Sequence, residues 1–248
     1  MIELKNANQL VLMRNAGRIV AETLALIREH AKPGVTTLEL DRIAEKYIRA
    51  QGAIPAFKGY NGFPATLCTS VNEQVVHGIP GLRILESGDI ISIDCGALIE
   101  GYFGDAAVTL PIGEVGEDLQ KLLRVTEESL MQGIAQAKVG NRLYDVSNAV
   151  QTHVEANGFS VVRDYVGHGI GKAMHEDPQI PNFGKPGRGP RLEVGMALAI
   201  EPMVNMGTYE VQTLKDRWTV VTKDNRPSAH FEHTVAITEN GLEILTRC

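Results

Sequence analysis

The chain has 248 residues, 44% of them hydrophobic, which is enough for a substantial core in one large domain or two small ones. Its net charge of −6 gives no electrostatic basis for binding nucleic acid or an anionic membrane. The longest apolar stretches, such as 194–200, fall far short of the roughly 20 residues of a membrane span, and the N-terminus has no apolar signal segment. Cys68, Cys95 and Cys248 lack zinc-ligand spacing and indicate free thiols in a reducing cytoplasm.

Two helices are predicted at the start of the chain. Apolar residues recur at helical spacing over about residues 6–30. Thr36 and Glu39 have the spacing of a capping box, which predicts a second helix that opens there and ends before Gly52. Short strands are then predicted at 65–71, 75–76, 90–97 and 102–110.

After Pro111 the same order of elements begins again. Helices are predicted over 118–137 and up to Asn157, followed by a Pro- and Gly-rich surface loop at 178–190. Further strands are predicted near 159–162, 196–204, 209–214, 218–222 and 231–237.

The two halves form a faint internal repeat. An offset of 106 residues places Gly34 and Gly52 on Gly140 and Gly158. Two helix pairs against one continuous curved antiparallel sheet would give an α+β fold with a pseudo-two-fold axis. Because no low-complexity linker separates the halves, residues 1–248 are interpreted as one domain, with halves of about 1–111 and 112–248.

Asp94 and Asp105 lie eleven residues apart, each within a stretch that reads as buried strand. A hairpin closed about Ile99 and Glu100 would pair them directly, with Cβ atoms about 5 Å apart. Two buried carboxylates at that distance repel each other unless something neutralises them. The arrangement therefore predicts one or two divalent cations.

Two further acids stand alone in apolar strands, Glu201 in GMALAIEPMV and Glu232 in AHFEHTVAIT. One buried acid has ordinary explanations, such as a hydrogen bond to backbone amides or an arginine partner. Four of them in one small domain favour a shared site, which the repeat would bring together across the pseudo-axis.

Three histidines lie beside glycines or at the ends of short apolar runs, and are interpreted as site residues: His77, His168 and His175. The other four, His30, His153, His230 and His233, are interpreted as ordinary surface or structural histidines. Carboxylates with one imidazole suit Mn²⁺, Fe²⁺, Co²⁺ or Zn²⁺, and bridging carboxylates suit two ions about 3.5–4 Å apart. The sequence does not select among these metals.

Five segments in a fixed order, VVHGIP, IDCGALIEGYFGDAA, YVGHGIGKAMHEDPQIPNF, AIEPM and HFEHTV, resemble the methionine aminopeptidases, specifically the short bacterial type I form. The resemblance implies the pita-bread fold and the removal of initiator methionine when the second residue is small, by attack of a metal-activated hydroxide on the first peptide bond. A nascent protein or peptide would be the substrate and transient contact with the ribosome is expected, while no interface stripe predicts more than a monomer.

The resemblance also implies a role for each site residue. Asp105 and Glu232 would bridge two divalent ions; Asp94 would bind one, and His168 and Glu201 the other. Glu201 would also carry the proton, and His77 and His175 would bind the scissile amide and stabilise the intermediate. The methionine side chain would fill an apolar pocket formed by Phe57, Tyr60, Phe63, Cys68, Met174 and Trp218.

Three of these pocket positions depart from the family pattern. The family often has Cys where Phe57 stands, Tyr where Phe63 stands and an aromatic residue where Met174 stands, which leaves the fine selectivity open.

Three alternatives remain open: a proline-cleaving peptidase of the aminopeptidase P or prolidase type, which usually has an additional N-terminal domain; a non-catalytic binding protein; and a creatinase-like hydrolase without metal. The presence of all five ligands argues against the last two.

Overall fold

The computed structural model describes residues 1–247, so the predicted free thiol of Cys248 lies outside the described residues. The helices are α1 Ala7–His30, α2 Thr37–Ala50, α3 Glu117–Gln136 and α4 Leu143–Ala156, with a 3₁₀ turn, η1, at Tyr60–Gly62. The strands are β1 Ile54–Pro55, β2 Leu67–Val71, β3 Gln74–Val76, β4 Ile90–Ile99, β5 Tyr102–Pro111, β6 Ser160–Val161, β7 Gly167–Gly169, β8 Glu176–Ile180, β9 Ala197–Ile200, β10 Met203–Asn205, β11 Val211–Thr213, β12 Val220–Thr222, β13 Ser228–His230, β14 His233–Thr238 and β15 Gly241–Ile244.

The helix boundaries follow from local chemistry. Glu39 N donates to Thr36 Oγ1 at 3.2 Å, and Thr36 N donates to Glu39 Oε2 at 2.7 Å, which completes the predicted capping box of α2. Asn6 and Gln9 cap α1 in the same way. Both predicted starts are confirmed.

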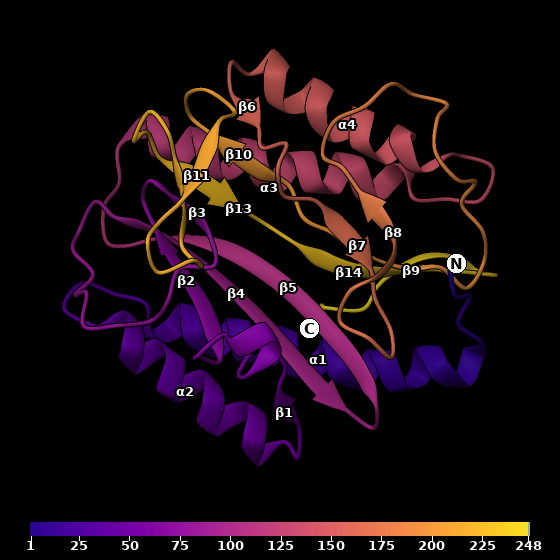
Figure 1. Cartoon of the computed structure of the whole chain (residues 1–248), viewed down its shortest axis with the longest axis horizontal. Helices are drawn as coiled ribbons and strands as arrows, with labels where there is room; N and C mark the ends of the chain where they lie inside the picture. Colours follow the sequence, from indigo (N-terminus) through magenta and orange to yellow (C-terminus); the bar gives the residue numbers. More distant parts are fainter. Residues whose placement is uncertain (248) are drawn as a thin grey trace.

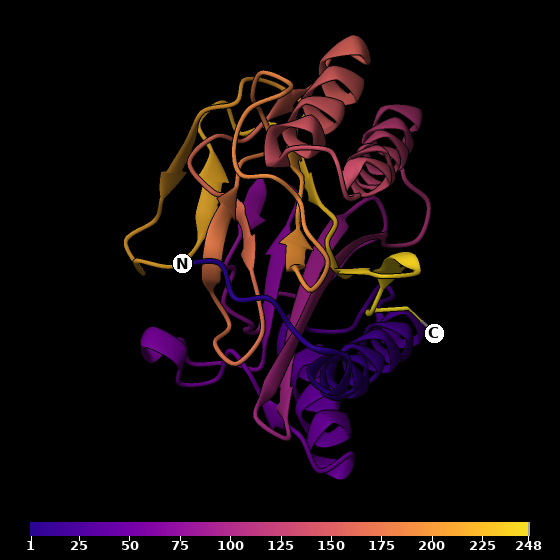
Figure 2. The same ribbon diagram turned by 90° about the vertical axis from the view of Figure 1, so that its right-hand side faces the viewer.

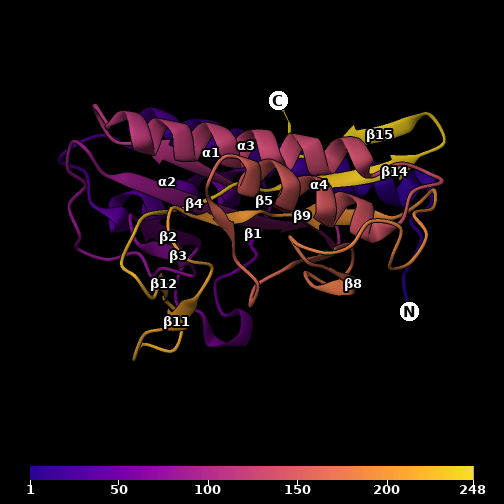
Figure 3. The ribbon, with the colours of Figure 1, turned by 90° about the horizontal axis from the view of Figure 1, so that it is seen from above.

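The internal repeat is confirmed by the helix pairs. Adding the offset of 106 to the bounds of α2 gives the bounds of α4, and it moves the end of α1 to the end of α3. In the views of Figure 1 and Figure 2, the pair α3–α4 lies near the top of the molecule and the pair α1–α2 near the bottom. Seen from above, the helices form one layer over β4, β5, β9 and β14, and β8, β11 and β12 lie on the other side (Figure 3).

The sheet is less continuous than predicted. All strand pairings are antiparallel, but they form four hydrogen-bonded groups, of which the larger contain β1, β2, β4 and β5, and β7, β8, β9, β14 and β15. The predicted strand 196–204 is divided into β9 and β10, and β13 precedes β14 where one strand was predicted. The predicted loop at 178–190 begins only after Ile180, because β8 extends to that residue.

The main core lies between the helix layer and the strands. Ile91 and Ile93 of β4 are fully buried in one cluster with Ile19 of α1 and Leu40 of α2. This packing leaves the opposite face of β4 and β5 available for a site. Within residues 1–247, no helix has the length and apolar character needed to cross a membrane.

Candidate metal centre and substrate pocket

One cavity of about 190 Å³ contains every residue for which a site role was predicted. Its lining comprises Phe57, Tyr60, Phe63, Cys68, His77, Asp94, Asp105, His168, Met174, His175, Glu201, Trp218 and Glu232, together with Asn61. A larger hollow of about 560 Å³ lies along α1 and α3, and of the predicted residues it contacts Glu232 alone. The smaller cavity is therefore the candidate site.

Asp94 and Asp105 lie on one face of the β4–β5 hairpin, but they are not a direct pair. Asp94 lies opposite Ala107, and Asp105 lies opposite Gly96. The predicted pairing is wrong because the hairpin turns at Glu100 and Gly101, both with positive φ, as a two-residue type I′ turn requires. The two carboxyl groups nevertheless interact, because after burial the charge of Asp94 is the next cause that raises the pKa of Asp105.

His168 lies in β7, between β8 and β9, where the strands approach closely. A Cβ on Gly167 would lie 2.3 Å from Ala199 O, and one on Gly169 would lie 2.1 Å from Asp177 O. The flanking glycines therefore make room for neighbouring backbone.

Glu201 and Glu232 lie in two matching interruptions of the sheet, and not within strands as predicted. Glu201 falls between β9 and β10, and Glu232 falls between β13 and β14. Pro202 has no N–H with which to continue the ladder. At the second interruption Glu232 N donates instead to Ala107 O of β5 at 2.9 Å, which fixes this glutamate beside Asp105.

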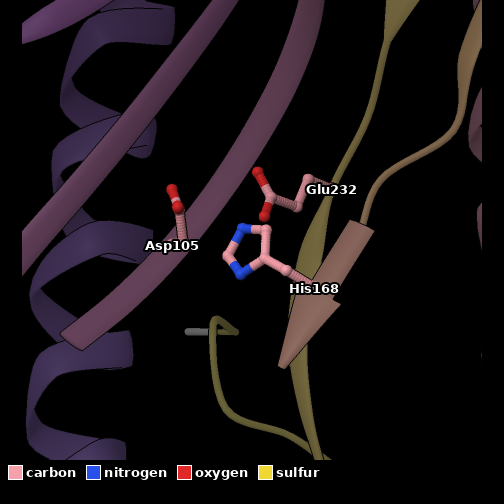
Figure 4. A group of neighbouring side chains, drawn as sticks. All are labelled: Asp105, His168 and Glu232. Carbon is pink, nitrogen blue, oxygen red and sulfur yellow. The ribbon is translucent and has the colours of Figure 1, made fainter. Parts of the chain in front are cut away.

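Three side chains form a ready cradle for a cation. Asp105, His168 and Glu232 each offer a ligand atom, and these atoms lie within 4.8 Å of one another, from three separate segments of chain (Figure 4). Glu201 Oε1 lies 3.5 Å from His168 Nε2 and adds a fourth donor. Asp94 Oδ1, Asp105 Oδ1 and Glu232 Oε1 are buried without a hydrogen-bond partner among residues 1–247. Buried, unpartnered carboxylate oxygens fit a divalent cation.

Burial makes the charged form of these acids unfavourable. It raises the pKa of Asp94 to about 7 and that of Glu201 to about 8. Burial first, and then the neighbouring acids, raise the pKa of Asp105 and of Glu232 well above the ordinary range. Without a cation the cluster therefore holds protons at neutral pH, and a bound cation would replace them.

The imidazoles have the opposite shift. Burial lowers the pKa of His168 to about 4, and that of His77 to about 4, so both are neutral at physiological pH. His168 Nδ1 lies 2.8 Å from Gly169 O, a carbonyl that can only accept. The ring proton is therefore on Nδ1, and the Nε2 lone pair is free to bind a metal.

The predicted apolar residues form one wall of the cavity. Phe57, Phe63, Cys68 and Met174 pack in a single buried cluster, with Trp218 at its edge. The Phe63 and Trp218 rings meet edge to face at 5.1 Å. Burial, and then the charge of Asp94, raise the pKa of the Cys68 thiol, so this cysteine stays protonated and acts as part of the wall.

His77 and His175 enter the cavity from two loops. His77 follows β3 with a φ of 59°, an uncommon conformation for a non-glycine residue that is found preferentially at functional sites. His175 precedes β8, whose first residue, Glu176, is bonded at 2.6 Å by the buried Lys5. The predicted pair thus reaches one cavity from distant parts of the chain.

His230 was missed by the sequence interpretation. It is buried, and its Nε2 lies 3.5 Å from Glu201 Oε2. Thr109 holds its backbone, donating to His230 O and accepting from His230 N, each at 2.8 Å. Its position two residues before Glu232 was the available signal, since alternate residues of a strand share a face.

Comparison with known proteins agrees with this geometry. Residues 11–239 match the model of metallopeptidase family M24. A methionine aminopeptidase of Clostridium perfringens is 62% identical over 246 residues, which covers 99% of each chain. The crystal structure of methionine aminopeptidase from Thermotoga maritima superposes with a TM-score of 0.98 at 48% identity over 100% of both chains. An Xaa-Pro dipeptidase from Bacillus anthracis shares the fold, with a TM-score of 0.79 and 21% identity, but 62% of its length is covered.

The fold and the buried acid cluster define a metallopeptidase, and the chain belongs to family M24. Within that family it groups with the bacterial methionine aminopeptidases, which match along essentially its full length.

Proposed function

We propose that this chain is an aminopeptidase that removes N-terminal methionine from peptides and nascent proteins, preferring a small second residue. The observation that carries the proposal is the single cavity in which five metal-ligand side chains lie beside an apolar wall. The wall would receive the methionine side chain, a flexible thioether that packs well against aromatic rings. The similarity to methionine aminopeptidases supports the same activity.

The five proposed ligands would hold two divalent ions. Asp105 and Glu232 would bind both ions. Asp94 would bind one of them, and His168 and Glu201 would bind the other. The unpartnered oxygens and the neutral His168 support this assignment. Divalent ions in such a site lower the pKa of water and so supply a nucleophile near neutral pH. Co²⁺, Mn²⁺, Fe²⁺ and Zn²⁺ all suit this donor set.

The remaining chemistry would belong to side chains. Glu201 would accept a proton from the nucleophile and deliver it to the leaving amine, a role suited to a carboxyl group whose pKa is raised to about 8. His77 and His175 would hydrogen-bond the scissile amide and stabilise the charge that develops on its oxygen. The dry, apolar wall would strengthen these interactions by excluding water.

The setting of the reaction is also a proposal. One catalytic domain acting as a monomer in the cytoplasm, with transient contact to the ribosome, fits an enzyme that acts on nascent chains. The unpaired thiols of Cys68 and Cys95 support a reducing compartment. The net charge of −6 supports no separate role in nucleic-acid binding.

Peptide specificity tests the proposal. Metal-loaded protein should cleave Met-Ala-Ser and leave Ala-Pro peptides intact, with release of free methionine measured by chromatography. Met-Leu-Ser is the matched control for the second position and should be cleaved far more slowly. Preference for Ala-Pro would favour the prolidase alternative, and the absence of hydrolysis together with the absence of bound metal would favour a non-catalytic protein.

A further inference from the structure

Tyr60 makes a direct polar contact with a proposed catalytic imidazole. Its hydroxyl lies 2.8 Å from His175 Nδ1, and the two ring centroids are 5.4 Å apart. His77, the other proposed catalytic histidine, makes no side-chain hydrogen bond within residues 1–247, and its ring faces Tyr165 at 5.5 Å and Trp218 at 6.4 Å. Tyr60 is therefore more than one of the residues that form the pocket wall.

The backbone holds Tyr60 in place for this contact. Tyr60 N donates to Phe57 O at 2.9 Å, and Phe63 N donates to Tyr60 O at 2.9 Å. Phe57 and Phe63 are themselves buried in the apolar wall. The short turn η1 is thus tied at both ends to buried pocket residues, which fixes the backbone of Tyr60, and the contact with His175 holds its hydroxyl.

The two neighbouring imidazoles have different kinds of hydrogen-bond partner at Nδ1. The His168 and His175 ring centroids are 4.3 Å apart. His168 Nδ1 faces a carbonyl, which only accepts, so its Nε2 is unprotonated. His175 Nδ1 faces a phenol, which can donate to the unprotonated nitrogen of a neutral ring and so place the single N–H of that ring on Nε2.

We infer that Tyr60 is a positioning residue: it donates to His175 Nδ1 and so holds the ring as the Nε2–H tautomer. Nε2 is then a hydrogen-bond donor, which is what an oxygen gaining negative charge requires. The cavity would thus contain two neighbouring imidazoles with different roles: His168 with an Nε2 lone pair for a metal, and His175 with an Nε2–H donor. In each ring, the partner of Nδ1 determines the tautomer. The inferred tautomer rests on the contact with Tyr60; its use in catalysis rests on the proposed function.

Nuclear magnetic resonance reports the tautomer independently of activity. In Zn²⁺-loaded protein labelled with [¹⁵N]histidine, long-range ¹H–¹⁵N correlations distinguish the two tautomers, and His175→Ala assigns the His175 signals. The wild type should show Nε2–H at His175, and Tyr60→Phe should move these signals toward the other tautomer. Tyr102→Phe is the matched control, because it removes a buried phenol hydroxyl that does not line the cavity. This hydroxyl accepts a hydrogen bond of 2.9 Å from Gln9 Nε2. An Nδ1–H tautomer in the wild type, or unchanged signals in Tyr60→Phe, would overturn the inference.

Kinetics test the consequence. Tyr60→Phe should lower kcat on Met-Ala-Ser by roughly tenfold, the factor that one net hydrogen bond supplies, with KM nearly unchanged. In a His175→Ala background the same substitution should have no further effect, because the two residues act as one unit. A raised KM with unchanged kcat would show that Tyr60 is only a pocket wall. If the wild type fails to cleave methionine peptides at all, the proposed function fails, and the tautomer signals still decide the role of Tyr60.

Discussion

Asp105 lies among other buried acids. It is buried beside Asp94, it contributes to the three-residue cradle, and Oδ1 has no partner in the described chain. Asp41 offers a contrast, since it is equally buried but its Oδ1 accepts from Thr66 N at 2.9 Å and Leu67 N at 2.8 Å. Backbone amides satisfy Asp41, whereas Asp105 Oδ1 has no partner among residues 1–247 and is suited to bind a cation.

Removing Asp105 should therefore abolish function without loss of fold. Asp105→Ala is expected to lose bound metal and turnover, because it removes a proposed shared ligand, and Glu232→Ala should behave alike. Metal content after dialysis and the rate on Met-Ala-Ser measure both effects. Asp41→Asn, the buried control, should keep its metal. More than a few per cent of wild-type turnover in metal-replete Asp105→Ala would contradict the bridging role.

For single residues, the sequence predicted the members of the candidate site better than the contacts between them. Asp94, Asp105, Glu201 and Glu232 were predictable because each is an isolated acid in an apolar stretch, and an unpaired buried charge is costly. The contact of His230 with Glu201 depends on how β10 and β13 pair, Met203 lying opposite His230, and no local pattern specifies that pairing.

Among the elements, the β4–β5 hairpin carries two of the five proposed ligands and packs on α1. A Cβ on Gly104 would lie 2.7 Å from Gly17 N and 2.8 Å from Ala16 C, both backbone atoms of α1. No side-chain rotation relieves such a contact, so a larger residue would push β5 away from the helix.

Gly104→Ala should accordingly destabilise the protein by about 1–3 kcal/mol, as overpacking does, and weaken metal binding at the adjacent Asp105. Urea unfolding and metal titration measure the two effects. Gly81→Ala is the control, since the nearest atom to its Cβ is Ile79 O at 4.0 Å. Equal stability of the two variants would show that the close packing of β5 on α1 is not required.

The hairpin also shows where sequence reasoning fell short at this scale. The strands and their shared face were predictable from alternation, but the register depends on the turn. Glu100–Gly101 supplies the positive φ pair that a type I′ turn needs, and reading that signal would have corrected the pairing by one residue on each side. The break at Glu232 is set by a hydrogen bond to Ala107 of β5, which no local pattern predicts, whereas Pro202 marks the break at Glu201 in the sequence.

At the scale of the molecule, the two halves each supply part of one charge cluster. Asp94 and Asp105 come from the first half and His168, Glu201 and Glu232 from the second, as the internal repeat predicted. The cluster joins the halves, so its charge affects the stability of the whole chain.

The stability of the metal-free protein should fall as the pH rises from about 6.5 to about 8. Unfolded carboxyl groups have a pKa near 4, whereas the folded pKa of Asp94 is about 7 and that of Glu201 about 8, so the folded chain retains protons that the unfolded chain has released. Buried His77 and His168 have a folded pKa of about 4, whereas an unfolded histidine has a pKa of about 6.5. They therefore make the stability rise with pH, but only up to about pH 6.5.

Each retained proton lowers the free energy of unfolding by about 1.4 kcal/mol per pH unit. Urea unfolding at several pH values measures this slope. Metal-loaded protein is the control and should be much less sensitive, because cations replace the protons. A metal-free protein whose stability is constant or rises over this range would refute the electrostatic account of the cluster.

The most direct test of the metal site as a catalytic centre is a titration of metal-free protein with Mn²⁺ or Co²⁺. Bound metal and hydrolysis of Met-Ala-Ser are measured in the same samples. Turnover should rise from background in step with bound metal and stop rising at no more than two ions per chain. Full turnover in metal-free protein, or the absence of any metal binding, would contradict the account of the site as a catalytic metal centre.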